Sequence, residues 1–189
     1  MRKNTGLATR VGAILLTSCG AMLPAAGVTP TAAWLYPAIA HHGGVHPRET
    51  LPFRPEPSQE YRIIVDVAST DKDPAKVANS LDRLARLVNL MAYAGVPPAH
   101  THIVAVLDEG AGLLALTNAV YRTRFKVNNP NLPLLHQLKT YGVQLLVCSQ
   151  AMAEAGFPDD AVTPDVTISL SALTDFAVFG REGYSYMRL

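Results

Sequence analysis

The chain has 189 residues, of which 49% are apolar and 16% are charged, a length and composition typical of one globular domain with extensions. The formal net charge of +1 leaves no basic surplus, and no lysine- or arginine-rich segment with interleaved aromatic residues occurs. Composition therefore argues against nucleic-acid binding.

The first 33 residues have the layout of a secretory signal. Basic residues come first, and the run from Val11 to Leu23 is then apolar or built of small residues. This run is shorter than the roughly 20 apolar residues of a membrane-spanning helix. We therefore exclude residues 1–33 from the fold and expect a periplasmic or secreted protein.

Two ways of processing this signal remain open. Leu16 to Cys19 reads LTSC and matches the bacterial lipobox, in which the cysteine becomes the lipidated first residue. Alternatively, cleavage near Gly27 or Ala33 would release a protein without lipid. A lipid anchor at Cys19 is the only membrane attachment that we expect.

Residues 34–60 are rich in proline and are interpreted as an extended arm or linker, which could also pack across a neighbouring subunit. Three histidines, His41, His42 and His46, lie within six residues of each other. They could bind a metal ion, but no acidic or cysteine ligand is close in sequence and no spacing fits a structural zinc site. We expect a solvated histidine loop, with no metal and no cofactor.

The remaining residues, 61–189, alternate between strand and helix patterns. The clearest helix spans Lys76 to Ala94, where apolar residues recur every three or four positions. Strands are expected at residues 61–68, 101–107, 143–147, 166–170 and 183–187, and further helices at 113–125, 132–141, 151–155 and 171–181. This alternation predicts a single α/β domain whose mainly parallel sheet has about five strands, with helices on both faces.

Asp108 and Glu109 follow the second strand directly and precede Gly110 and Gly112. Ligand clefts of open α/β sheets lie outside the carboxyl ends of the strands, so both carboxylates are candidate binding residues. Adjacent side chains of a strand point to opposite faces, so they need not act together. A solvated loop is the alternative interpretation.

Cys148 lies where the short apolar run from Val143 to Val147 ends and a helix begins. Free N–H groups at a helix start stabilise an anion, and the thiolate is the reactive form of cysteine. We expect the thiol at the edge of a cleft, with Ser149 and Gln150 supplying hydrogen bonds to the sulfur. The alternative is a buried cysteine that packs as a small apolar residue.

The segments NPNLPLLHQLKTYGVQLLVCSQAMAEAG and DVTISLSALTDFAVFGREGYSYM resemble the DsrE/DsrF-like (YchN-like) family, with a match that covers roughly residues 61–189. This resemblance implies a compact α/β fold assembled as dimers, trimers or hexamers. It also implies that Cys148 accepts and passes on a persulfide sulfur. Several relatives have His-Gly after the second strand, where this chain has Asp108, Glu109 and Gly110.

Two functions follow from these observations. The first is an extracytoplasmic sulfur carrier or sulfurtransferase that holds a persulfide on Cys148, with a sulfur donor and an acceptor that the sequence does not name. The second is a non-catalytic oligomeric module that binds a small ligand or a partner protein, with Cys148 structural. Walker A, GxGxxG, CxxC and GxSxG signatures are absent, so the usual nucleotide-binding and hydrolase functions have no support.

Overall fold

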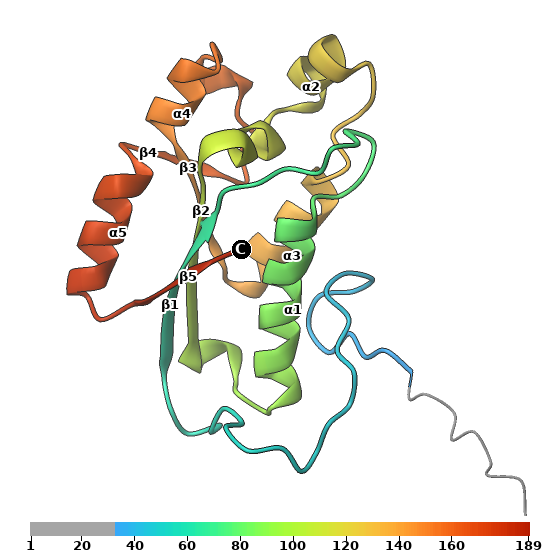
Figure 1. The fold of residues 1–189 in the computed structure, drawn as a ribbon, viewed down its shortest axis with the longest axis vertical. Coiled ribbons are helices and arrows are strands. Elements are labelled where there is room, and N and C mark those ends of the chain that lie inside the picture. The colour runs from blue at the N-terminus through green and yellow to red at the C-terminus, as the bar shows by residue number, and fades with distance from the viewer. Residues whose placement is uncertain (1–32) are drawn as a thin grey trace, which may run out of the picture. The chain divides into compact units, whose positions relative to one another are not determined.

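A computed structural model of the chain describes residues 33–189. These residues form a parallel sheet of five strands in the order β4-β3-β2-β1-β5 (Figure 1), which confirms the predicted fold class. The strands are β1 (Tyr61–Val67), β2 (Thr101–Leu107), β3 (Gln144–Cys148), β4 (Thr167–Ser169) and β5 (Ser185–Arg188). The helices are α1 (Asn79–Tyr93), α2 (Asn118–Phe125), α3 (Leu132–Tyr141), α4 (Ser149–Glu154) and α5 (Ala172–Arg181). Three 3₁₀ segments are η1 (Pro98–His100), η2 (Glu109–Ala115) and η3 (Asp159–Ala161).

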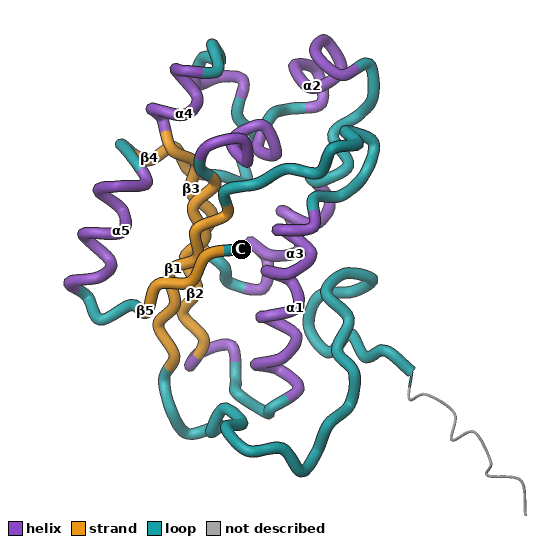
Figure 2. The backbone as a smooth tube through the Cα atoms, viewed as in Figure 1, coloured by secondary structure: helices purple, strands orange, loops and turns teal. Residues whose placement is uncertain are grey.

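The sheet separates two apolar clusters of unequal size. Helices α1 and α3 lie on one side of it and α5 lies on the other (Figure 1 and Figure 2). The larger cluster contains Val65, Ala105 and Val147 of the strands together with the apolar stripe of α1, and the smaller one contains Ile64, Val106 and Leu146. Neighbours along each strand therefore fall into opposite clusters, as the period of two requires for a sheet buried on both faces.

The helix expected at 113–125 is divided in two, which corrects that prediction. Residues Glu109–Ala115 form η2, and α2 begins only at Asn118. Between them the backbone is engaged elsewhere, because Thr117 N–H donates to Ala161 O and Thr163 N–H donates to Ala115 O, both at 2.8 Å. Contact with a segment 46 residues away thus engages backbone groups that a continuous helix would use for its own hydrogen bonds.

Part of the arm folds back on α1 of the same chain. Residues 35–45, here called the hook, are closed by reciprocal backbone hydrogen bonds between Leu35 and Val45, both at 2.9 Å. Ile39 and Val45 are buried. Gly43, at φ +61°, lies so close to α1 that an added Cβ would come within 2.1 Å of Arg86 N. The hook is therefore part of the folded domain.

Asn89 of α1 is the polar residue that holds the hook. Its side chain is fully buried, at 0% exposure. Its Oδ1 accepts hydrogen bonds from Ala38 N–H (2.9 Å) and Ile39 N–H (2.8 Å). Its Nδ2 donates to the carbonyl oxygens of Ile39 (3.2 Å), His42 (2.9 Å) and Gly43 (3.1 Å). One amide side chain thus serves five backbone groups of the hook.

Several expectations concern residues before 33 and lie outside the described part of the chain: the signal segment, cleavage near Gly27 and lipidation at Cys19. Among the described residues, no helix is both long enough and apolar enough to cross a membrane.

Candidate functional site

Cys148 is the last residue of β3 and immediately precedes α4, as the sequence predicted. Leu145 and Val147 belong to the cluster on the α1 side of the sheet, whereas Leu146 and Cys148 belong to the cluster on the α5 side. Strand alternation therefore directs the Cys148 thiol toward α5. Within residues 33–189 it is the one cysteine, and it is unpaired.

The thiol is buried rather than placed at an open cleft edge. Cys148 is 3% exposed and belongs to a cluster with Ala172, against which Ala151 and Phe176 also pack. Ala172 and Phe176 come from the first half of α5. The apolar cluster on the α5 side of the sheet, to which Ala172 also belongs, therefore leaves the sulfur nearly inaccessible to a reagent in solution.

The strand register brings polar residues to the same face and the same edge of the sheet as Cys148. Ser169 is the Cα partner of Cys148, and Asp66 of β1 is the partner of Val106 in β2. Asp108 N–H donates to Val67 O at 3.0 Å, so the extended backbone continues one residue past β2. Alternation then assigns Asp66, Asp108 and Ser169 to the face of Cys148.

Asp175 connects the first turn of α5 to this row. Its Oδ2 accepts a hydrogen bond from Ser169 Oγ at 2.5 Å. Burial raises the pKa of Asp175 above its ordinary value, and the negative charge of Asp108 raises it further, while the bond from Ser169 opposes both. The Ser169–Asp175 contact therefore fastens the start of α5 to β4, beside the strand that ends in Cys148.

Asp66, at the other end of the row, is buried in β1, beside the neighbouring strand β5. Its Oδ2 accepts a hydrogen bond from Tyr186 Oη at 2.7 Å and pairs with Arg188 Nη1 at 3.2 Å. The bond to Asp66 is the largest of the causes that raise the pKa of Tyr186. Arg188 Nη2 also contacts Glu109 Oε1 at 3.0 Å. These contacts join the C-terminal strand to β1 and to the start of η2.

Ser149 and Gln150, which were predicted to supply hydrogen bonds to the sulfur, instead share one backbone acceptor. Ser149 Oγ donates to Leu170 O at 2.7 Å, and Gln150 Nε2 donates to the same carbonyl at 3.2 Å. Both side chains thus bind the loop between β4 and α5. Asp108 contributes to the electrostatics of Asp175, whereas Glu109 turns to Arg188.

Sequence reasoning did not include Asp66, Ser169 and Asp175 in the site. The signal that could have found Asp66 is strand alternation, because Asp66 is two residues from Ile64 and is flanked by Val65 and Val67. Ser169 and Asp175 are brought together by the short connection from β4 to α5, and the direction of that connection was not evident from the sequence.

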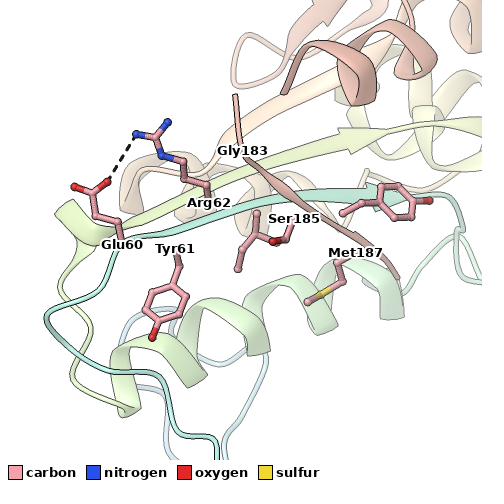
Figure 3. A pocket seen from close by; sticks show the side chains of 8 residues that line it. Glu60, Tyr61, Arg62, Gly183, Ser185 and Met187 are labelled. Atoms are coloured by element: carbon pink, nitrogen blue, oxygen red, sulfur yellow. Dashed lines mark ion pairs between the residues drawn. The ribbon is translucent and has the colours of Figure 1, made fainter. Parts of the chain in front are cut away.

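The best-defined hollows among the described residues are not lined by Cys148. One of about 360 Å³ is lined by residues near the starts of β1 and β5, including Tyr61, Ser185 and Met187 (Figure 3). At its rim, Arg62 Nη2 and Glu60 Oε2 form an ion pair at 3.8 Å. Within the described residues, no group of three histidine, cysteine, aspartate or glutamate side chains is placed to hold a metal ion.

The fold agrees with the comparisons with known proteins. The model of the DsrE/DsrF-like family matches residues 61–189, and the chain belongs to this family. A protein of unknown function from Methanobacterium thermoautotrophicum, MTH1491, has a similar fold, with a TM-score of 0.52 and 18% identity over 69% of this chain and 100% of that one. The ychN protein from E. coli also matches, with a TM-score of 0.45 and 18% identity over 68% of this chain and 99% of that one. No curated protein matches the sequence.

Proposed function

We propose that this DsrE/DsrF-like protein carries sulfur as a persulfide on Cys148 and works outside the cytoplasm. Membership of a family often associated with sulfur relay supports the chemistry. The observation that carries the proposal is the position of Cys148, at the carboxyl end of a central parallel strand and beside a row of polar side chains. This is the edge at which open α/β sheets bind their ligands.

The reaction is an exchange between sulfur atoms. The Cys148 thiol loses its proton, and the thiolate attacks the outer sulfur of a donor persulfide, R–S–SH. A new S–S bond forms on Cys148 while the S–S bond of the donor breaks, and the donor leaves as its thiolate. No net oxidation occurs. The acceptor takes the sulfur in the reverse sense.

Access to the buried thiol requires a movement of the first turn of α5. Ala172, at the start of α5, belongs to the same buried cluster as Cys148, and the Ser169–Asp175 hydrogen bond fastens the first turn of α5 to β4. Breaking one side-chain hydrogen bond costs about 0.5–1.5 kcal/mol, or up to about 3 kcal/mol when one partner is charged. An opening of this size populates a small but reactive fraction of molecules.

Location outside the cytoplasm is supported by the sequence before residue 33, either with a lipid on Cys19 or after ordinary cleavage. Fractionation of cells that produce the wild type and Cys19→Ala distinguishes the two. The lipidated form is expected with membranes and its variant in the soluble periplasmic fraction. Equal solubility of both would exclude the lipid anchor, and retention of both in the cytoplasm would exclude export.

Assembly with further copies is supported by an apolar surface here called the C-terminal patch, which consists of the exposed residues Leu170, Leu173, Val178 and Tyr186. Helix α5 presents Leu173 outward at 79% exposure although its other side already packs on the sheet. A helix that is apolar all round is normally buried. In addition, a sheet of five strands spaced about 4.8 Å apart is wider than one helix of about 10 Å diameter. Helix α5 alone is therefore too narrow to cover its face of the sheet. Sedimentation of Leu173→Asp is expected to show smaller particles than the wild type.

The alternative function, a binding module in which Cys148 is structural, is favoured by one specific observation. The thiol is almost fully buried among apolar side chains. The rate of alkylation of the folded protein at neutral pH separates the two functions. Labelling of Cys148 well before global unfolding supports the carrier, whereas labelling only after denaturation supports the module.

A further inference from the structure

Apart from Met187, the exposed large apolar side chains of residues 33–189 fall into two groups on opposite sides of the sheet. One group is the C-terminal patch on α5 and β5. The other, here called the arm patch, consists of Trp34, Leu35, Tyr36, Leu51, Phe53 and Leu90. Figure 1 shows the arm beside α1, with the sheet between it and α5. The arm patch therefore needs an explanation separate from the assembly through α5.

Part of the arm patch lies along one face of α1. Arg86 Cζ lies 6.0 Å from the ring centroid of Trp34, and Arg54 Cζ lies 5.1 Å from that of Tyr93. Arg86 and Tyr93 are separated by two helical turns, about 10 Å, and Leu90 lies between them on the same face. Trp34, Leu90 and the loop that holds Phe53 thus lie along the same stretch of α1.

Phe53 is the most exposed member of this surface. It is 101% exposed, and its backbone is left-handed with φ +59°, a conformation that a bulky residue rarely adopts. The loop is held by Arg54, whose Nη1 donates to Arg48 O at 2.9 Å and to Glu49 O at 3.4 Å. Strained backbone that displays a side chain to solvent is characteristic of functional surfaces.

We propose that the arm patch docks on a lipid membrane surface. Tryptophan and tyrosine, both present here, are the residues enriched at the membrane–water interface, where one end of the side chain is apolar and the other polar. The chain that precedes Trp34 contains the apolar run Val11–Leu23, which ends only eleven residues before it. Any attachment through that run or through Cys19 would hold the arm patch next to the bilayer.

The charge of the arm makes this an apolar contact rather than an electrostatic one. Residues 34–60 contain two arginines and three glutamates, so anionic lipid gains little from them. Docking is therefore expected on zwitterionic lipid and with little dependence on salt. It would turn the arm side toward the bilayer and leave the α5 side, which carries Cys148, facing away. The proposal does not depend on sulfur chemistry.

The chain contains a single tryptophan, so its fluorescence reports on the patch alone. The full chain is mixed with phosphatidylcholine vesicles whose acyl chains are brominated, which quench only at membrane depth. We expect the emission of Trp34 to shift to shorter wavelength and to be quenched. Phe53→Ser should lower the ratio of quenched to unquenched tryptophan roughly tenfold, since burying one such side chain contributes more than the 1.4 kcal/mol that corresponds to tenfold.

Ala153→Ser is the control, because Ala153 is an exposed residue of α4 that belongs to neither patch, and it should leave the quenching unchanged. Unquenched Trp34 in vesicle-bound protein would overturn the proposal, because the chain would then be tethered without docking. Equal quenching of Phe53→Ser and wild type would also overturn it. A short-wavelength emission without vesicles would assign the patch to another occupant. That occupant is a second copy if the shift grows with protein concentration, and residues 1–32 if it does not.

Discussion

Replacing Asn89 by alanine should release the hook from α1. The substitution removes the partner of two backbone N–H groups and three carbonyl groups. A buried group left without its partner costs about 1–3 kcal/mol, but the hook can detach and let water replace the lost bonds. Detachment therefore limits the free-energy cost of the five lost hydrogen bonds. We expect the free energy of unfolding to fall by roughly 2–4 kcal/mol. At about 2–4 °C per kcal/mol for a domain of this size, Tm should fall by roughly 5–15 °C.

The assay combines thermal melting with amide hydrogen exchange. The amides of Leu35 and Val45, which bond each other's carbonyl groups across the base of the hook, should lose their protection in Asn89→Ala while the amides of the strands keep theirs. Gln137→Ala is the matched control, because Gln137 Oε1 accepts a single exposed bond from Ala40 N–H at 3.0 Å in the same hook. A Tm loss no larger than that of the control, or a hook that stays protected, would refute the reasoning.

Other predictions concern the cover of the thiol and the fit of the hook. Because the pKa of Asp175 is raised in the folded protein, its contribution to stability is present at low pH and is lost as pH rises through the folded pKa. Asp175→Asn should therefore unfold at a higher temperature than the wild type at pH 7, and denaturation curves at pH 3 should show that advantage reduced; an equal advantage at both pH values would contradict the raised pKa. Asp175→Ala, which cannot bond Ser169, should increase the alkylation rate of Cys148 severalfold in the folded state, measured by mass spectrometry, and an unchanged rate would show that this turn is not the cover. Gly43→Ala should displace the hook and lower Tm, because its Cβ would overlap the backbone of Arg86, and an unchanged Tm would contradict the close approach.

The elements with strong local signals were predictable from the sequence. The apolar run before Cys148 forms a buried strand that ends at that residue, and the stripe of α1 faces the core from Leu81 to Met91. Gly142 ends α3 at φ +115°, a conformation that glycine adopts without strain. In these places local propensity and burial favour the same structure.

The parts of the structure that differed from the prediction depend on partners far away in the sequence. Ala115 and Thr117 bond the segment around residues 161–163, which interrupts the expected helix. The hook is fixed by Asn89, about 50 residues away, and a single asparagine in a helical pattern does not indicate such a contact. The sequence also located Cys148 at a strand end but did not indicate that Asp175 bonds Ser169 at the same edge, since that bond depends on how α5 packs.

The central claim is that Cys148 carries sulfur, and mass spectrometry of the intact protein after incubation with a low-molecular-weight persulfide tests it most directly. The account predicts a gain of about 32 Da, one sulfur atom, that peptide mapping assigns to Cys148 and that is absent from Cys148→Ala. Alanine is preferred to serine as the control, because a serine hydroxyl buried at this position without a partner would cost about 1–3 kcal/mol. The contradicting result would be that neither the wild type nor Asp175→Ala gains sulfur on Cys148, although the thiol of Asp175→Ala is open to alkylation.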